Sequence, residues 1–465
     1  MQTKLSKTAD PAITAKVRRA VAYVTIVFAV PVLIVILDRF GIRVLGGPIE
    51  HSGWVLAGLS IYWLVIVGLV AVRIRHGSWI EFLRQRRMHL ILFAISGLCG
   101  LVAVEIAMRV VFPGSHLPTF TLLRSSEFHH RNPPSTDMYW GRLDGGTIVL
   151  HSNADGLRTR YSPDEFRKRA TRIAILGDSF AYGYGVQENE ALPSVLQELL
   201  GARSGDKEVA VLNAAVISYS PLLALNLFDR VIKDYRPTLT IFVLDLSDIG
   251  DDCNYGQQLV HPGEGDITFD APDQVLPDKW ISGLALIRVF NSFGDWVFAP
   301  IAPIVGRFSN PPLPVYHYDA IDLDINGVNE TNRFFITRYP LADTQPYFQA
   351  SWGHIQRLAD SAAEIGSEFL LVVAPRFQQW SDTECPNNWE TIFYALDEPY
   401  EYEYFRFFEQ VGSEVSFPIL DLLPAFQETT RFPLVFDRDP HWNPDGHRFV
   451  AEVLSDYLIA EGLVD

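Results

Sequence analysis

The sequence of 465 residues predicts an α/β domain built on a parallel sheet, preceded by three membrane-spanning helices. Two observations lead to this fold class. After residue 146, short apolar runs of strand length alternate with segments whose apolar residues recur at helical spacing, and such alternation favours a parallel sheet with right-handed crossovers. Before residue 113, three apolar runs each come close to the roughly 20 residues that cross a bilayer.

Residues 1–112 form the predicted membrane domain, with transmembrane helices at about residues 21–37, 54–72 and 90–111. Buried core helices are the alternative interpretation of these runs. The length of the runs and the arginine clusters beside them favour a bilayer. The lipid bilayer is therefore the first partner that the sequence predicts.

Basic residues are unevenly distributed around these runs. Five lysines and arginines precede the first run, five arginines separate the second from the third, and only two arginines lie between the first and second. Because cytoplasmic loops collect Lys and Arg, we expect the N-terminus in the cytoplasm and everything after about residue 113 outside it, in a periplasm or at the cell surface. No small-residue cleavage site follows the first run, so we expect no cleavable signal peptide.

Charge also separates the two parts of the chain. The formal net charge is −17, but residues 1–112 carry 13 Lys/Arg and 5 Asp/Glu, which leaves the remainder strongly acidic. Nucleic-acid binding needs a basic surface, so the composition argues against a nucleic-acid partner. An acidic outer part suits a soluble domain or a neutral or cationic ligand.

The outer part divides into a linker at residues 113–145 and a domain at residues 146–465, with an insertion at about 250–335. Prolines and mixed polarity predict the linker, and Pro, Gly, Asp and aromatic residues enrich the insertion. In the domain we expect strands at residues 173–176, 209–213, 239–246, 368–374 and 418–422, and helices at residues 192–200, 221–234, 347–365, 402–411 and after 444.

His129 and His130 fall in the predicted linker. Adjacent histidines more often face apart than share a metal, and no Cys/His cluster elsewhere has metal-ligand spacing, so we expect no metal and no cofactor. Cys99 lies in the third apolar run and is expected to be a free thiol. Cys253 and Cys385 follow strands that can be neighbours in an oxidising compartment, and the sequence leaves a disulfide between them open.

The first candidate site is Gly177-Asp178-Ser179, which follows an apolar strand. A strand that ends in a sharp turn can expose a serine nucleophile at the carboxyl edge of a parallel sheet, although a surface turn is the plainer alternative. An α/β-hydrolase elbow needs glycine where Ala181 stands, and a phosphate-binding loop needs a lysine that is absent here.

The second candidate site lies just before the last predicted helix. Asp439 and His441 are two residues apart in an extended Asp-Pro-His loop. A serine hydroxyl needs a base, and the base needs an orienting group, so this pair could serve Ser179. A helix-entry turn, with the aspartate as a cap and the histidine on the surface, is the alternative.

Together these motifs resemble the SGNH/GDSL hydrolase superfamily. Its first block matches Gly177-Asp178-Ser179-Phe180. The stretch from Asn213 to Pro221 is similar to the second block, with Ser218 at the glycine position, and Asp245-Leu246-Ser247-Asp248 is similar to the third, with Ser247 at the asparagine position. Asp439 and His441, followed by Asn443, Gly446 and His447, match the last block. The resemblance covers about residues 146–465 and implies a flavodoxin-like, three-layer α/β/α domain.

The resemblance also implies roles for these residues. Ser179 would be the nucleophile, His441 the base and Asp439 the group that orients it. The N–H groups of Ser179 and Ser218 and the Ser247 hydroxyl would form the oxyanion hole. Asp178 and Asp248 would support the site, and His447 would be a helix-start residue rather than a second base.

The implied function is that of a membrane-anchored serine esterase or O-acyl (acetyl) transferase that acts on an extracytoplasmic acyl ester of a glycan, beside polysaccharide-assembly proteins. The aromatic-rich segments 280–296 and 394–408 could stack on sugars or belong to the core. Serine hydroxyls reach less far than asparagine amides, so the alternative is a catalytically weak, SGNH-fold glycan-binding or assembly protein.

Overall fold

The computed structural model describes residues 120–464, except 146, 205–208, 261–266, 271–272, 275–320 and 393–397, together with Ser96, Gly100 and Val102. The expected transmembrane runs and Cys99 therefore lie outside the described residues, apart from those three positions. Within the described part of the chain, no helix has both the length and the hydrophobicity to cross a bilayer. The chain divides into two compact units, and the unit formed by residues 117–276 and 312–465 holds the elements that position the site.

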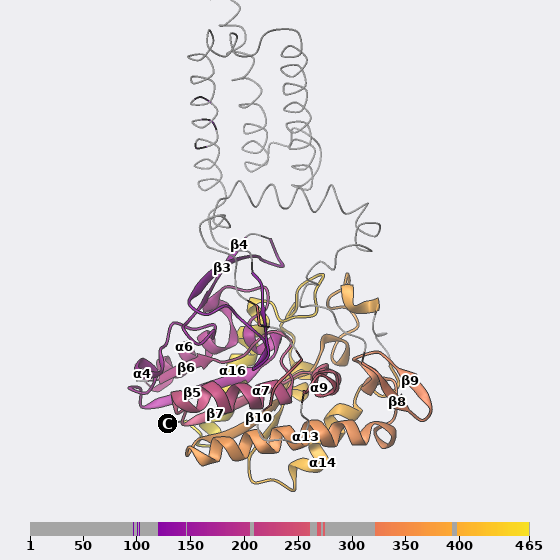
Figure 1. Ribbon diagram of the computed structural model, residues 1–465. Coiled ribbons are helices and arrows are strands. Elements are labelled where there is room, and N and C mark those ends of the chain that lie inside the picture. The colour runs from indigo at the N-terminus through magenta and orange to yellow at the C-terminus, as the bar shows by residue number, and fades with distance from the viewer. Residues whose placement is uncertain are drawn as a thin grey trace, which may run out of the picture. The chain divides into compact units, whose positions relative to one another are not determined.

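A five-stranded parallel sheet lies at the centre of this unit (Figure 1). Its strand order is β11-β10-β7-β5-β6. The strands are β5 (Thr171–Gly177), β6 (Val209–Asn213), β7 (Leu239–Leu244), β10 (Glu368–Val373) and β11 (Ile419–Asp421). They occur where short apolar runs were expected, and β6 and β7 are buried along their whole length. The predicted α/β class with a parallel sheet is confirmed.

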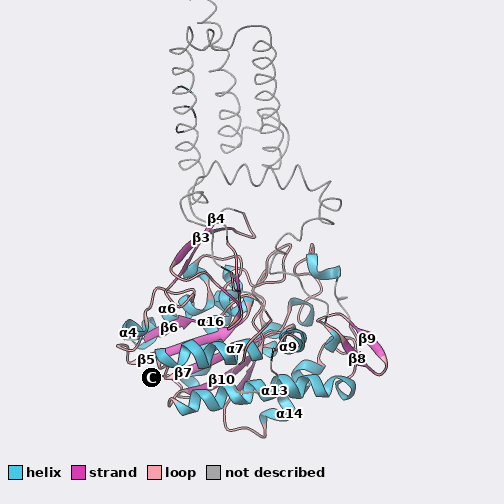
Figure 2. Ribbon diagram, in the orientation of Figure 1, coloured by secondary structure: helices cyan, strands magenta, loops and turns pink. Residues whose placement is uncertain are grey.

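Helices cover both faces of the sheet (Figure 2). Because β6 and β7 flank β5 on opposite sides, right-handed crossovers place α6 (Leu192–Ser204) and α7 (Pro221–Leu227) on opposite faces. Helix α16 (Pro444–Ala460) packs against α6, while α13 (Leu341–Glu364) packs against α7. Helices α9 (Asp248–Gln257) and α14 (Glu403–Gly412) both contact α13. The arrangement is a three-layer α/β/α sandwich.

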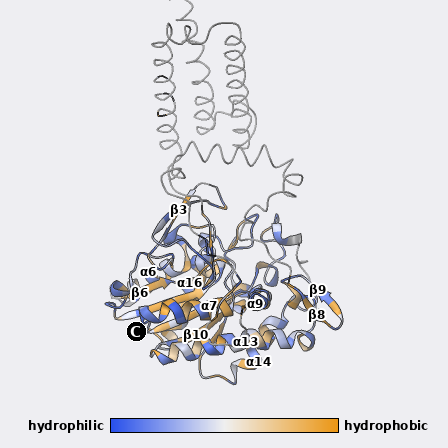
Figure 3. Ribbon diagram, viewed as in Figure 1, coloured by the Kyte–Doolittle hydropathy of each residue, from blue (hydrophilic) through white to orange (hydrophobic). Residues whose placement is uncertain are grey.

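Shorter segments connect these elements. They are α4 (Pro163–Phe166), α5 (Ser179–Tyr182), η2 (Glu188–Glu190), η3 (Phe228–Ile232), α8 (Lys233–Tyr235), η4 (Phe335–Thr337), η5 (Phe377–Gln379), η6 (Trp389–Ile392) and α15 (Leu423–Glu428). Hydropathy follows the layers, because the central strands are strongly hydrophobic and the outer helix faces are polar (Figure 3). One continuous core joins the sheet to both helix layers.

The expected linker is structured over the part that is described. Residues 120–145 contribute the hairpin of β1 (Leu123–Ser125) and β2 (His129–Arg131), and strand β3 (Thr136–Gly141), which pairs with β4 (Thr147–Ser152). Strands of three residues are too short to show alternation in the sequence. Within the expected insertion, α9 occupies its first residues and β8 (Leu323–Ile325) pairs with β9 (Val328–Glu330).

Candidate active site

The serine of the first motif starts a short helix at the carboxyl end of β5. Gly177 has a φ of 145°, and a Cβ there would lie 2.6 Å from the Val243 carbonyl oxygen, so only glycine fits the turn. The Asp178 carboxylate then accepts from the Phe180 N–H at 2.9 Å and caps helix α5. Ser179 is therefore the first helical residue, and it is 8% exposed.

The structure brings the second motif to this serine. The Nε2 atom of His441 lies 2.7 Å from the Ser179 Oγ, although 262 residues separate the two positions. On the other side of the ring, His441 Nδ1 is hydrogen bonded to Asp439 Oδ1. These contacts fix the roles of the ring nitrogens, because Nδ1 can donate to the carboxylate while Nε2 accepts from the serine.

The loop that carries the base is held by the start of α16. Asn443 caps this helix by accepting from the Gly446 N–H at 2.9 Å, and its amide donates to the Val435 carbonyl at 3.0 Å. Gly446 lies against the chain, since a Cβ there would be 2.0 Å from the Leu434 carbonyl oxygen. The Asn and Gly of the last motif therefore build the loop that aims His441.

Two aromatic rings enclose the His441 imidazole. Tyr184 stacks on it with centroids 4.4 Å apart, and Phe180 lies 4.8 Å away at 30°. Burial by itself lowers the pKa of His441, but the charge and hydrogen bond of Asp439 outweigh it and hold the pKa above 6.5. Burial raises the pKa of Asp439, and the His441 charge and hydrogen bond bring it below its usual value. The geometry thus favours an ionised Asp439 and a base that readily accepts a proton.

Trp389 is a site residue that sequence reasoning missed. Its indole N–H donates to Asp439 Oδ2 at 2.9 Å, and its ring is 39% exposed at the cavity beside Ser179. The tryptophan lies 50 residues before Asp439, in a short 3₁₀ segment without strong periodicity. No local pattern in the sequence could have identified it.

Ser218 lies where an oxyanion donor was expected. It follows β6, lines the same cavity as Ser179 and His441, and has a φ of 64°, in the left-handed region that favours glycine. Among the described residues, no acceptor takes the Ser218 N–H or the Ser179 N–H. Both amides are therefore available to a ligand in the cavity.

Ser247, by contrast, is not placed at the cavity. It is completely buried, and its N–H and hydroxyl both donate to Asp245 Oδ2, at 3.0 and 2.6 Å. The Arg376 guanidinium donates to the Ser247 Oγ at 3.3 Å. The short side chain is thus turned toward its own loop, and in this structure it does not occupy the position of the third oxyanion donor that the resemblance implied.

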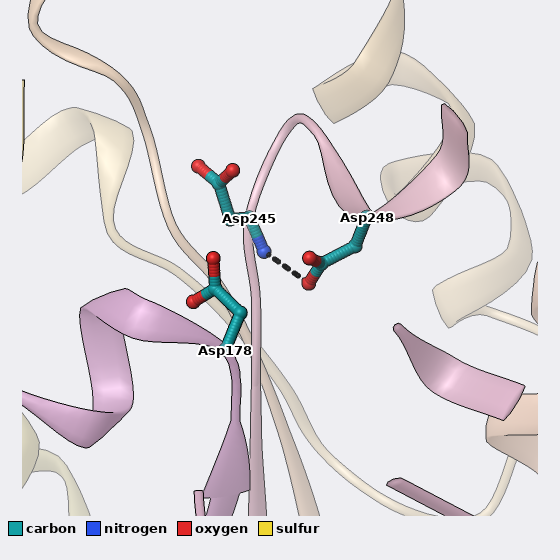
Figure 4. Close-up of side chains that lie close together, drawn as sticks. All are labelled: Asp178, Asp245 and Asp248. Atoms are coloured by element: carbon teal, nitrogen blue, oxygen red, sulfur yellow. Dashed lines mark hydrogen bonds between the residues drawn. The ribbon is translucent and has the colours of Figure 1, made fainter. Parts of the chain in front are cut away.

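Three buried carboxyl groups, those of Asp178, Asp245 and Asp248, lie close together (Figure 4). Asp178 Oδ2 lies 3.2 Å from the Ser179 Oγ, and Asp248 Oδ2 accepts from the Asp245 N–H at 2.9 Å. Both oxygens of Asp245 are taken by Arg376, which lies 2.8 Å away. Asp178 and Asp248 therefore support the turn and the start of α9.

The charges of this cluster are unequal. Burial, and then the Asp245 charge, raises the pKa of Asp178 to about 6, while burial, and then the Asp178 charge, raises the pKa of Asp248 well above its usual value. Arg376 overcomes burial and lowers the pKa of Asp245. Because the Arg376 guanidinium already binds Asp245, and burial disfavours a charge on Asp178 and Asp248, the three carboxyl groups do not offer three free charged ligands to a metal ion.

Helix α9 and the β1–β2 hairpin form the rest of the cavity wall. Asp251, Asn254 and Tyr255 lie on one helical face, together with the following Gln258. Arg333 reaches this face with a 2.6 Å ion pair to Asp251. Burial, reduced by the Arg333 charge, raises the pKa of Asp251 to about 7. The wall is polar and offers several groups that can bind hydroxyls.

His129 and His130 also line the cavity, and they face each other rather than apart. Their Nδ1 atoms lie 2.7 Å apart, and His130 Nε2 is 2.8 Å from the Ile217 carbonyl oxygen. Burial and the neighbouring His129 lower the pKa of His130 to about 3, so His130 is neutral and donates through Nε2. The tight β1–β2 turn, with a φ of 61° at His129, brings the rings together.

Other candidate residues have structural positions. Burial lowers the pKa of His447 to about 3, so it is neutral, and it lies in the first turn of α16. In the described part of segment 394–408, Tyr404, Phe405, Phe407 and Phe408 belong to the core, while segment 280–296 is outside the described residues. Cys253 and Cys385 are free thiols, so the disulfide considered from the sequence is not formed.

Comparison with known proteins gives structural but no sequence relatives. No protein-family model matches the chain, and no curated protein matches its sequence. Among solved structures, it is similar to a psychrotrophic esterase of Pseudoalteromonas, with 12% identity over 63% of this chain and 97% of that one and a TM-score of 0.31. It is also similar to an acetylxylan esterase of Geobacillus stearothermophilus, with 11% identity over 62% of this chain and 93% of that one and a TM-score of 0.32. A second acetyl xylan esterase shares 13% identity over 62% of this chain and 99% of that one, with a TM-score of 0.32.

Proposed function

We propose that this chain is a serine-dependent esterase or O-acyl transferase with Ser179 as its nucleophile. The observation that carries the proposal is the hydrogen-bonded series from Ser179 through His441 to Asp439, with 2.7 Å between Ser179 Oγ and His441 Nε2. A buried serine hydroxyl becomes nucleophilic when an adjacent base takes its proton, and a carboxylate that orients the base completes the arrangement.

In the proposed reaction, the Ser179 oxygen attacks an ester carbonyl while its proton passes to His441 Nε2. The tetrahedral intermediate collapses, the acyl–oxygen bond breaks, and His441 returns the proton to the departing alcohol. The acyl group is then esterified to Ser179. A second hydroxyl group, from water or from a sugar, then gives its proton to His441 while its oxygen attacks the acyl carbon. The bond between the acyl group and Ser179 breaks, His441 returns the proton to the Ser179 oxygen, and the acyl group leaves as an acid or as a new ester.

The N–H groups of Ser179 and Ser218 are the proposed oxyanion donors. Both border the cavity, and neither has an acceptor among the described residues. Donors fixed in place before the charge develops stabilise the intermediate without reorganising, and the loss of one can cost about 3–4 kcal/mol in the barrier. Asp439 stays ionised and stabilises the imidazolium that forms when His441 is protonated.

The proposed substrate is a small acyl ester, such as an acetyl ester, on an extracytoplasmic glycan. The polar wall from α9 supports a hydroxyl-rich ligand, because its carboxylate can accept from sugar hydroxyls and its amides can both donate to them and accept from them. The three apolar runs before residue 113 support a membrane anchor, with polysaccharide-assembly proteins as neighbours. Hydrolysis and transfer differ in the acceptor that enters after the first alcohol leaves.

A fluorophosphonate probe tests the nucleophile directly, since it forms a covalent bond only with an activated serine. The full-length chain is incubated with the probe and with a panel of acyl esters, and the labelled residue is mapped. We expect the label on Ser179 and turnover that disappears in Ser179→Ala. Ser413→Ala, which changes an exposed serine at the end of α14 that does not line the cavity, is the matched control. Full activity in Ser179→Ala would overturn the assignment.

Reporter fusions test the proposed membrane topology separately. Fusions after Arg87 and after Pro113 are expected on opposite sides of the membrane, because only the third apolar run separates the two positions. A cytoplasmic signal from both fusions would exclude an extracytoplasmic site. It would leave the serine chemistry itself untouched.

One observation favours a second candidate, a catalytically weak glycan-binding or assembly protein. The buried position of Ser247 leaves the cavity with two backbone donors and no side-chain donor at the position the resemblance implied. This candidate predicts saturable glycan binding that persists in Ser179→Ala, without turnover of any acyl ester. Ser179-dependent turnover of one ester in the panel excludes it.

A further inference from the structure

Ser218 adopts a backbone conformation that its residue type disfavours. Its φ of 64° lies in the left-handed region, where a Cβ is crowded by its own backbone and glycine is the usual residue. This conformation matters because it determines the direction of the Ser218 N–H. A serine held there needs contacts that a glycine would not require.

The phenol of Tyr255 supplies two such contacts. Its oxygen lies 2.7 Å from the Ser218 Oγ, and its hydroxyl donates to the Ser218 carbonyl oxygen at 2.9 Å. Because the single phenolic proton is given to the carbonyl, the Ser218 hydroxyl donates to the phenolic oxygen. One side chain of α9 thus binds both the side chain and the backbone of Ser218.

Further contacts fix α9 against the segment that contains Ser218. The Asp252 carboxylate accepts from the Leu222 N–H at 2.7 Å, just after Ser218 in the chain. On the opposite side, a Cβ at Gly250 would lie 2.1 Å from the Arg333 carbonyl oxygen, so this glycine lets the 333 segment lie against the helix. The Arg333–Asp251 ion pair of 2.6 Å joins the same two segments. Tyr255 is therefore presented to Ser218 from a firmly held helix.

We propose that Tyr255 is a positioning residue, which holds Ser218 in the left-handed conformation and so directs its N–H toward the oxyanion of the acyl-transfer reaction. The proposal rests on the proposed function of the site. In the superfamily that this chain resembles, a single glycine stands at this position, and glycine adopts this conformation unaided. Here Ser218 and Tyr255 do so together, because the Ser218 hydroxyl bonds to the phenol and the phenol holds the strained Ser218 backbone. Tyr255 itself does not touch the reacting atoms.

The substitutions Tyr255→Phe, Ser218→Ala and Ser218→Gly separate this role from general packing. Phenylalanine keeps the ring, which packs 4.6 Å from His129, and removes only the hydroxyl. We expect Tyr255→Phe and Ser218→Ala each to lower kcat by about tenfold to a hundredfold, somewhat less than complete loss of an oxyanion donor, with little change in KM. Ser218→Gly provides the background for the comparison, since glycine adopts the left-handed conformation without support from Tyr255.

The decisive measurement is the double variant Ser218→Gly with Tyr255→Phe, in the full-length chain. We expect glycine to rescue most of the kcat that Tyr255→Phe removes. An equal fold-loss from Tyr255→Phe in both backgrounds would overturn the proposal, as would an unchanged kcat in Tyr255→Phe alone. If Tyr255→Phe does not fold on its own, the double variant is compared with Ser218→Gly. The proposal predicts equal kcat in these two variants, because glycine needs no support from the phenol, and an unequal kcat would overturn it.

A stability measurement keeps this test independent of the proposed function. Thermal unfolding of the wild type, the two single variants and the double variant should show that Tyr255→Phe lowers the Tm more when Ser218 is present than in the Ser218→Gly background. Equal shifts in both backgrounds would show that the phenol does not hold Ser218. If the wild type has no Ser179-dependent turnover, the proposed function fails, and the thermal cycle still decides whether Tyr255 holds this backbone.

Discussion

The indole N–H of Trp389 and the His441 ring occupy the two different oxygens of the Asp439 carboxylate. Trp389 donates to Oδ2 at 2.9 Å, while Oδ1 accepts from His441 Nδ1 and, at 3.1 Å, from the His441 backbone N–H. The carboxylate therefore cannot rotate without breaking one of these bonds. Trp389 also borders the cavity. A substrate that contacts its ring would therefore also affect the position of Asp439, which orients His441.

Replacement of Trp389 by phenylalanine should lower kcat about tenfold. A hydrogen bond to a charged group contributes roughly 1.5–3 kcal/mol, and about 1.4 kcal/mol in the barrier changes a rate tenfold. Steady-state kinetics on an activated acyl ester measure the effect. Trp352→Phe, in α13 and away from the cavity, is the control for loss of an indole. Equal kcat in Trp389→Phe and the wild type would show that the bond to Asp439 does not contribute.

Removal of any catalytic residue should abolish most of the rate. We expect Ser179→Ala and His441→Ala each to lower kcat by roughly 10⁴ to 10⁶, and the double variant to be little worse, since the residues act as a unit. Asp439→Asn should be comparable or milder, because an amide fixes the wrong imidazole tautomer. Additive losses in the double variant would mean that the two residues work independently.

The pH dependence follows from the state of His441. Its pKa lies above 6.5, because the Asp439 charge and hydrogen bond outweigh the effect of burial. A base must be neutral, so kcat/KM should rise with pH and reach half of its plateau above pH 6.5. In Asp439→Asn the residual activity should show a lower midpoint, since the two largest contributions that raise the pKa of His441, the Asp439 charge and its hydrogen bond, are then lost or weakened. An unchanged midpoint would contradict this electrostatic account.

The raised pKa of His441 also affects the stability of the fold. As the pH rises, this contribution to stability falls, whereas the activity rises. A histidine whose pKa is higher in the folded than in the unfolded chain stabilises the fold most below the unfolded value of about 6.5. This stabilisation is lost as the pH rises through the folded pKa. Activity and the contribution of His441 to folding should therefore change in opposite directions across that window, as comparison of wild-type and His441→Ala thermal unfolding can show.

Ser247→Ala tests whether the Ser247 side chain stays buried against Asp245, as observed, or acts in the oxyanion hole, as the resemblance implied. The hydroxyl donates to Asp245 at 2.6 Å within the core, so its removal should lower the free energy of unfolding by about 1 kcal/mol. Its effect on kcat should stay within about threefold. A loss of about a hundredfold or more would instead be typical of a missing oxyanion donor, and would show that Ser247 turns toward the substrate during the reaction.

The parts of the fold that could be predicted are those set by local sequence. The five central strands are short apolar runs, and the Gly177 turn and the Asn443 cap have local signatures. For the same reason, Ser179, Asp439 and His441 could be named before their contact was known. Their 2.7 Å approach depends on strand order, which brings β5 beside the loop before α16.

The parts that could not be predicted depend on contacts between distant residues. Ser247 turns inward because Asp245 accepts its hydroxyl, and Asp245 is held by Arg376, 131 positions further along. Tyr255 reaches Ser218 across 37 positions. The β1–β2 hairpin is too short to show a period, so its residues were assigned to a linker. In each case the partner, rather than the residue type, determines the role.

The separation of Ser179 from His441 along the chain also governs when this serine can first react. A ribosome that adds about 5–20 residues each second needs roughly 13–50 s to pass from one to the other, a span of 262 positions. Throughout that interval the nascent chain carries an ordinary alcohol. The proposed base is made 262 positions later, so a polypeptide that stops short of residue 441 lacks it. The order of the residues along the chain thus delays the proposed chemistry until residue 441 has been made.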